Sequence, residues 1–147
     1  MLDTIIEGTT LLNIEEDHYN ISYKRLCPSA EGMQKKDVVF PTMWELFVWS
    51  AILGYINKSP EEIKKRSPNP PFRWQVIKPH HQQLLLIMAV GSTGNFDILK
   101  NRDRLKSNIE EHSNGGLYLM HKAIALDPLA YRNMESLIYE IRDRLQA

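Results

Sequence analysis

The chain contains 147 residues, 43% of them hydrophobic and 24% charged, and its 18 basic and 18 acidic residues give a formal net charge of zero. This length fits a single domain with a sizeable core, and this composition excludes wholesale disorder. The single cysteine, Cys27, excludes an internal disulfide and suits a reducing compartment, where we interpret it as an inert thiol.

Two features predict a cytoplasmic protein that makes no membrane contact. The N-terminus lacks the basic start and continuous apolar core of a signal peptide, because Asp3, Glu7 and Gly8 interrupt its apolar residues. The longest apolar stretch, 43–56, contains Glu45 and is shorter than the roughly 20 residues that cross a bilayer.

Residues 1–37 are polar and weakly patterned, which predicts an N-terminal arm, and residues 38–147 are expected to form one helical domain. Thr42 and Glu45 match a capping box, in which the threonine oxygen accepts an amide hydrogen bond at the start of a helix. Apolar residues follow as far as Leu53, and Gly54 is placed to end the helix.

A second start signal, Ser59-Pro60-Glu61-Glu62, predicts a short helix over 60–66. Four prolines between 68 and 79 disfavour a helix, so we expect an extended segment or at most a small edge strand there. The apolar run that follows predicts a helix over 81–90, ended by the turn at 91–95.

A further helical region is expected from 96 to 112, helix again over 117–126, and a last helix after Asp127-Pro128. The predicted fold class is therefore all-α, a single-domain bundle of about five or six helices with a proline-rich extended segment or small edge strand near 68–79. Its core is expected to include Trp44, Phe47, Trp49, Leu53, Leu85 and Ile87.

The segment Asn114-Gly115-Gly116 interrupts the helical pattern. Each glycine inside a helix costs about 1 kcal/mol relative to alanine, so a pair needs a structural reason. Either the pair ends the helix in the left-handed conformation, as a kink or a full turn, or it lets another backbone, side chain or ligand approach closely. In both cases we expect alanine to be unfavourable at either glycine, with Asn114 supplying hydrogen bonds at a helix end.

The sequence contains no complete catalytic or metal-binding motif. The segment 91–94 lacks the Gly-Lys-Ser/Thr ending of a phosphate loop and is interpreted as a helix stop and turn. Neither His80-His81 nor the pair His112 and His121 shows ligand spacing. Glu110-Glu111 is typical of a solvated helix face. We therefore expect no catalytic residue, no metal and no cofactor.

The best candidate for a partner or nucleic-acid surface combines basic side chains with an indole, namely Lys64, Lys65, Arg66, Arg73 and Trp74. Such residues contact phosphates and stack on bases. The alternation of 72, 74 and 76 instead predicts a core position for the tryptophan. The ten basic and five acidic residues of 21–80 are also compatible with ordinary solvated loops.

Three groups of residues occur in an order that resembles a bacterial family. They are Phe40-x-Thr42-x3-Leu46-x2-Trp49-x-Ala51-x2-Gly54-Tyr55, then Arg73-Trp74-x-Val76, then Ile109-Glu110-Glu111-His112-Ser113-Asn114-Gly115-Gly116-Leu117. Over roughly 40–137 the chain resembles the proteins called DNA phosphorothioation-associated protein 4, or Dnd system-associated protein 4, encoded beside DNA-sulfur modification and restriction genes. The structural signature that we single out is Thr42, Glu45, Gly54, Asn114, Gly115 and Gly116.

The sequence departs from the pattern of that family at three places. Ser50 replaces the first alanine of Ala-Ala-x-x-Gly, His112-Ser113 replaces Tyr-Ala, and Ser59-Pro60 replaces a basic stretch. These departures are compatible with a remote relative that serves another bacterial DNA-defence system.

The resemblance implies a role in defence against phage or plasmid DNA, and it brings no catalytic residue with it. We expect a non-catalytic accessory subunit, not an enzyme, that holds a larger ATPase or nuclease. DNA contact within the assembly and homo-oligomerisation stay open. The alternative is a DNA-binding module acting through the basic loop region 58–78, which the neutral net charge disfavours.

Overall fold

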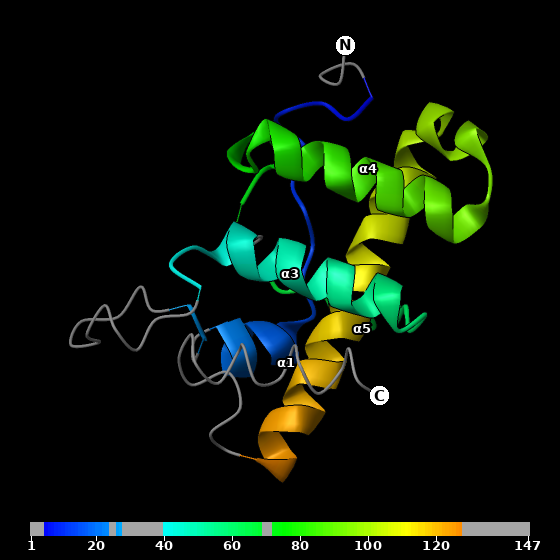
Figure 1. The fold of residues 1–147 in the computed structure, drawn as a ribbon. Helices are drawn as coiled ribbons and strands as arrows, with labels where there is room; N and C mark the ends of the chain where they lie inside the picture. The colour runs from blue at the N-terminus through cyan, green and yellow to red at the C-terminus, as the bar shows by residue number, and fades with distance from the viewer. Residues whose placement is uncertain (1–4, 24–25, 28–39, 69–71, 128–147) are drawn as a thin grey trace.

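A computed structural model of the chain describes residues 5–23, 26–27, 40–68 and 72–127 (Figure 1). Its α-helices are α1 (Glu16–His18), α3 (Met43–Ile56), α4 (Pro79–Thr93) and α5 (Arg102–Leu126). The π-helical turn η2 (Tyr19–Tyr23) continues α1, and the 3-10 turns η4 (Trp74–Val76) and η5 (Phe96–Lys100) precede α4 and α5.

The predicted all-α class is confirmed, because these ranges contain helices, turns and isolated bridges and no β-strand. The described ranges hold four α-helices, fewer than the five or six expected. The helix predicted after Asp127-Pro128 lies outside them, and no helix within them is long and apolar enough to cross a membrane.

The longest helix, α5, passes behind α3 and α4 in Figure 1, and its most extensive contact is with α3. At the crossing the two backbones touch. A β-carbon at Gly54 would overlap the carbonyl oxygen of His112, and one at Gly116 would overlap that of Ser50. Beside this contact the hydroxyls of Ser50 and Ser113 form a 2.8 Å hydrogen bond.

The expected helix interruption at 114–116 is wrong, because α5 continues without a break through both glycines. The other explanation, close approach of a neighbour, is confirmed: Gly116 lies against α3, and a β-carbon at Gly115 would overlap the carbonyl oxygen of Ser59. Asn114 also serves no helix end. Its Nδ2 donates to the carbonyl oxygens of Glu61 and Glu62, both at 3.2 Å, and fastens that loop to α5.

The capping prediction for α3 is confirmed, since Thr42 Oγ1 accepts from the Glu45 amide at 3.3 Å. The predicted end at Gly54 is wrong by one half-turn, because α3 continues to Ile56 and Asn57 caps it. Gly54 is needed for the contact with α5 and not for a turn.

The helix predicted over 60–66 does not form. The amide of Ser59 donates to Gly54 O at 2.9 Å and that of Glu61 to Glu111 O at 2.9 Å. These bonds hold the segment in an extended path along α3 and α5. The amides of Ser59 and Glu61 would lie at the start of the predicted helix, where first-turn amides are free for capping groups. Here they bond to carbonyl oxygens of α3 and α5 instead.

The N-terminal residues supply the neighbour of the proline-rich segment that the sequence did not reveal. Leu12 N donates to Phe72 O at 3.3 Å, and Trp74 N donates to Thr10 O at 2.8 Å. Isolated antiparallel bridges join Leu11 to Arg73 and residue 15 to residue 66. Extended backbone is thus present at 72–73, as expected, and the 3-10 turn η4 follows it.

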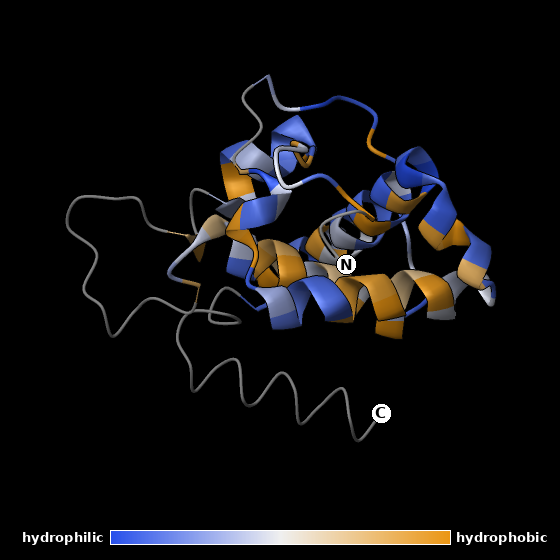
Figure 2. Ribbon diagram, turned by 90° about the horizontal axis from the view of Figure 1, so that it is seen from above, coloured by the Kyte–Doolittle hydropathy of each residue, from blue (hydrophilic) through white to orange (hydrophobic). Residues whose placement is uncertain are grey.

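The core combines the N-terminal segment with one face of each long helix. Four of the six predicted core residues, Trp44, Phe47, Leu53 and Leu85, are buried, and Trp49 packs against the core partly buried. Ile87 is 68% exposed, so its predicted burial is wrong. Apolar residues occupy successive positions of α4, and the sequence therefore did not mark which face of that helix is covered (Figure 2). Other fully buried side chains include Leu12, Leu46, Trp74, Ile77, Leu105, Ile109, Leu117 and Met120.

Helix α4 begins at Pro79, where proline suits the first helical position, and it ends at Gly94. Gly94 has a φ of 67°, a left-handed conformation that favours glycine, and its amide bonds back to Val90 O. The interpretation of 91–94 as a helix stop is confirmed, although the last turn of α4 extends three residues beyond the predicted end.

We predict that Gly116→Ala destabilises the fold. In a free helix the change would stabilise by up to about 1 kcal/mol, but here the β-carbon overlaps backbone of α3, and overpacking of this kind costs about 1–3 kcal/mol or more. Urea unfolding measures the difference. Gly91→Ala is the matched control, because a β-carbon there meets only the end of the flexible Tyr55 side chain. The higher helix propensity of alanine should then stabilise α4. Equal stabilisation by both alanines would contradict the close-approach explanation.

Candidate functional site

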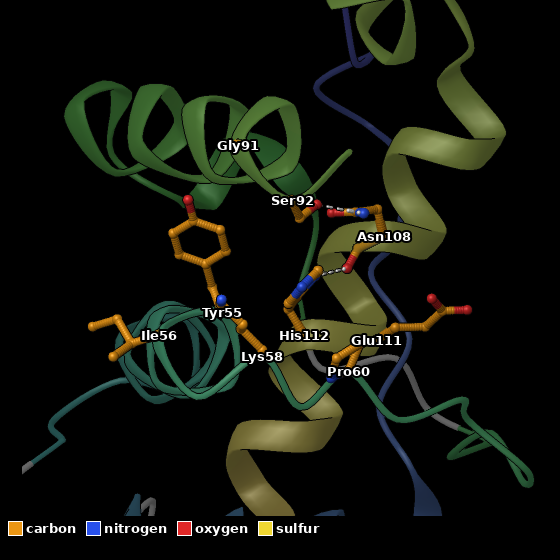
Figure 3. Close-up of a pocket in the computed structure, with 9 residues that line it drawn as sticks. All are labelled: Tyr55, Ile56, Lys58, Pro60, Gly91, Ser92, Asn108, Glu111 and His112. Carbon is orange, nitrogen blue, oxygen red and sulfur yellow. Dashed lines mark hydrogen bonds between the residues drawn. The ribbon is translucent and has the colours of Figure 1, made fainter. Parts of the chain in front are cut away.

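A cavity of about 520 Å³ lies between the C-terminal turns of α3 and α4 and the middle of α5 (Figure 3). Tyr55 and Ile56 line it from α3, and Lys58 and Pro60 from the following loop. The other walls come from Gly91 and Ser92 of α4 and from Asn108, Glu111 and His112 of α5. The volume is within the range of pockets that hold small molecules.

His112 presents an oriented imidazole at this cavity. Its Nδ1 lies 2.8 Å from the carbonyl oxygen of Asn108 one turn earlier, so Nδ1 carries the proton and donates. In the tautomer that this bond selects for a neutral ring, Nε2 is an acceptor, and no donor among the described residues bonds to it. The Tyr55 ring meets the imidazole edge-on at a centroid distance of 6.1 Å and helps to fix its plane.

A short hydrogen-bond chain joins α5 to α4 across the cavity wall. Asn108 Nδ2 donates to Ser92 Oγ at 2.9 Å, and Ser92 Oγ donates to Ala89 O at 2.9 Å. Asn108 Oδ1 is buried and has no partner. The Ser92 O–H and one N–H of Asn108 are thus engaged, while the acceptor Asn108 Oδ1 is left unpaired.

Tyr55 reaches from α3 to α4 because position 91 has no side chain. A β-carbon at Gly91 would overlap the Tyr55 hydroxyl, which lies directly below α4 in Figure 3. Lys58 follows α3 with a φ of 50°, a left-handed conformation uncommon for residues other than glycine. This turn brings the chain back towards α5, where Pro60 closes the cavity.

Two smaller hollows adjoin the cavity along α5. One of about 360 Å³ includes Asn108, Asp103 and Arg104, and one of about 120 Å³ includes Arg66 and Glu110. Glu111 lines all three spaces and therefore stands where they meet. Figure 3 shows its carboxylate turned away from Tyr55.

Glu110, the neighbour of Glu111 in sequence, is 6% exposed and holds the N-terminal segment on α5. Its carboxylate accepts from the Asn13 amide, and Lys106 Nζ lies 3.7 Å away. Burial raises the pKa of Glu110 above its usual value, and the Asn13 amide, Lys106 and Arg66 offset this only in part. The expected solvated face at 110–111 is therefore wrong for Glu110.

The five predicted binding residues lie outside the cavity. Lys64, Lys65, Arg66 and Arg73 are exposed on the side that packs against the N-terminal segment, where Lys65 Nζ pairs with Glu16 at 2.8 Å. The Glu16 carboxylate raises the pKa of Lys65. Trp74 is 2% exposed and belongs to the core, so its indole is not placed to stack on a base. A partner or nucleic-acid role for the four basic residues stays a prediction.

Reasoning from the sequence did not group Tyr55, Gly91, Asn108 and His112. Helical periodicity could have placed Asn108, His112 and Gly116 on one side of α5, because they are four residues apart and share one face in an unbroken helix. The assumed break at 114 removed that signal. An unbroken helix also places His121, nine residues after His112, on the opposite face.

The described ranges contain no group of three or more His, Cys, Asp or Glu side chains placed to hold a metal ion. Cys27 is buried, and its thiol donates to Thr42 O at 3.4 Å. Burial, with a smaller effect of Glu45, raises the pKa of Cys27 to about 12, so the thiolate is scarce at neutral pH.

The fold and the cavity define a small helical protein whose polar site lies between three helices. The chain belongs to the DNA sulphur modification system-associated protein 4 family, whose model matches residues 23–145. This match includes α3, α4, α5 and every residue that lines the cavity. No curated protein and no solved structure gives a significant match.

We predict that Glu110→Gln is increasingly favourable, relative to the natural chain, as pH rises from about 4 to 7. The folded-state pKa of Glu110 is raised, so its neutral form is preferred in the fold, and ionisation above the unfolded value of 4.5 opposes folding. Glutamine stays neutral and its oxygen still accepts from Asn13 N. Urea unfolding across this pH range measures the difference, with Glu62→Gln, an exposed carboxylate, as the control. Parallel pH profiles for the natural chain and Glu110→Gln would contradict the prediction.

Proposed function

We propose that the protein is a non-catalytic accessory subunit of a bacterial DNA-defence complex in the cytoplasm, where it holds a larger ATPase or nuclease. The family match supplies the context, a DNA sulphur modification system. The observation that carries the proposal is an exposed apolar surface next to the cavity.

This surface, which we call the α3–α4 face, is made by Ile56, Leu84 and Ile87. Ile56 and Ile87 are each 68% exposed, and Leu84 is 42% exposed. Leu84, Ile87 and Gly91 are three and four residues apart and share one side of α4, while Ile56 lines the cavity with Gly91. Exposed apolar side chains that share one side of a helix are typical of a surface that a partner covers.

Support for a non-catalytic role comes from three of the potentially reactive side chains; His112, whose Nε2 has no partner among the described residues, is not one of them. The Cys27 thiol is buried and bonded to a carbonyl oxygen, and the buried Glu110 carboxylate is engaged by the N-terminal segment. Ser92 Oγ, in the cavity wall, donates to Ala89 O. Each of these three groups is held in a hydrogen bond that stabilises the fold. It would have to break that bond to act as a nucleophile or general base.

The alternative DNA-binding role draws its support from the exposed Lys64, Lys65, Arg66 and Arg73. Acids partly neutralise this surface, since Glu16 pairs with Lys65 and Glu15 Oε2 accepts from the Lys64 amide at 2.9 Å. Electrostatic affinity for duplex DNA depends on the number of phosphates that are neutralised. With so few unpaired cationic side chains among its described residues, this region can neutralise only a few phosphates. We therefore rank the subunit role first.

The proposal predicts that a large ATPase or nuclease co-purifies with the tagged chain when it is expressed from its native gene neighbourhood. The double variant Ile56→Ser and Ile87→Ser should lose this partner, because polar side chains remove the apolar contact. Leu126→Ser is the matched control, since Leu126 is 89% exposed but lies at the far end of α5. Recovery of the chain alone at native expression levels would overturn the subunit role.

We predict that the isolated chain binds duplex DNA only weakly, and that any binding is lost between about 50 and 200 mM salt. Reversing the charge of Lys64, Lys65 and Arg66 should change this little. Fluorescence anisotropy with a labelled duplex measures the affinity, and circular dichroism checks that the variant is folded. Tight binding at physiological salt that the triple change abolishes would favour the DNA-binding alternative.

A further inference from the structure

We propose that the cavity between α3, α4 and α5 is a socket for an arginine side chain of the partner protein. The inference rests on the accessory role above and adds the chemistry of the contact. It follows from the imbalance between hydrogen-bond acceptors and donors in the cavity, from the direction of two helix dipoles and from the aromatic wall.

Apart from Lys58, the cavity lining offers more free hydrogen-bond acceptors than donors. When the His112 ring is neutral, Nε2 accepts, because Nδ1 donates to Asn108 O. The Tyr55 hydroxyl oxygen can also accept. The Glu111 carboxylate lies at the edge of the cavity away from Tyr55, and no ion pair among the described residues includes it. The Ser92 O–H and one of the two N–H groups of Asn108 are engaged within the wall. A guanidinium group has five donors and no acceptor, so it matches this lining better than a neutral or anionic group.

Two helices end at the cavity, and each places its negative end there. Tyr55 and Ile56 belong to the last turn of α3, and Gly91 and Ser92 to that of α4. The carbonyls of a last turn lack intrahelical partners and carry partial negative charge, which favours a cation. Backbone amides of the loop satisfy Gly54 O and Tyr55 O, while no backbone amide among the described residues bonds to Gly91 O or Ser92 O.

The remaining walls suit the stem and the plane of an arginine. The Tyr55 ring stands between α3 and α4 and can lie against a guanidinium plane. The α3–α4 face at the edge of the cavity can pack against the methylene groups. Arginine joins these two properties in one side chain, which is the reason for its enrichment at the centres of protein interfaces.

Lys58 opposes this assignment and also makes it testable. It is the cationic side chain in the lining, and it is exposed. If the socket takes an arginine, Lys58 repels the guest, and its removal strengthens binding. If the cavity takes an anion instead, Lys58 is the group that holds it, and its removal weakens binding. Lys58→Asn removes the charge and suits the left-handed backbone at this position.

The first experiment uses the isolated full chain and N-acetyl-arginine amide, followed through the ring signals of His112 and Tyr55 by NMR. We expect saturable shifts with this probe and none with N-acetyl-citrulline amide, its neutral analogue. Glu111→Gln should weaken binding and Lys58→Asn should strengthen it, each about two- to five-fold, as exposed charge pairs do. Gly91→Leu should abolish it by filling the cavity, whereas Gln83→Leu, exposed elsewhere on α4, should not.

Two results would overturn the socket. One is the absence of ring shifts with the arginine probe even in Lys58→Asn. The other is binding of N-acetyl-aspartate amide that Lys58→Asn abolishes, which would identify an anion site.

A second experiment separates this inference from the subunit role. Gly91→Leu and Glu111→Gln are compared with Gln83→Leu in the co-purification described above. Loss of the ATPase or nuclease only in the two cavity variants supports the socket. Retention of the partner by all three variants would leave the subunit role intact and overturn the socket, whereas an arginine-binding chain that recovers no partner would overturn the subunit role alone.

Discussion

The direct backbone contact between α3 and α5 is the constraint on which the other features depend. Gly54 and Gly116 each lower the helix propensity by about 1 kcal/mol relative to alanine, yet no side chain fits at either position. Close packing of two long helices offsets this cost through many dispersion contacts. The crossing also determines where the cavity lies, because Tyr55 and His112 follow and precede the two glycines by one and four residues on the same helices.

The three departures from the pattern that the chain resembles lie at this contact or in the adjoining loop. Ser50 and Ser113 replace two alanines and bond to each other at 2.8 Å, so each hydroxyl gives the other a partner inside the core. Both also lie within 3.3 Å of Phe47 O. His112 faces Tyr55, and the Ser59 carbonyl lies against Gly115. Because the replacements contact neighbours that can satisfy them, they alter the chemistry at the crossing without opening it.

The features predicted correctly from the sequence are local. The Thr42 cap, the glycine stop at Gly94 and the all-α class follow from short-range rules that need no knowledge of neighbours. The errors at Gly54, at 60–66 and at 114–116 share one cause, since each segment is shaped by the crossing of α3 and α5. The cavity depends on Gly91 and His112, which are far apart in sequence and meet only after that crossing is known.

Neighbouring residues of α5, on different sides of the helix, have different tasks. Asn108, Glu111 and His112 line the cavity, Ser113 and Gly116 meet α3, and Asn114 and Gly115 hold the loop that carries Lys58 and Pro60 to the cavity. The loop therefore depends on the same glycine pair as the helix crossing, although its residues face the site. A larger residue at 115 would displace Ser59 and, with it, the segment between the end of α3 and the cavity wall. Stability and the shape of the proposed binding site are thus set by the same few positions, and neither can be altered there independently of the other.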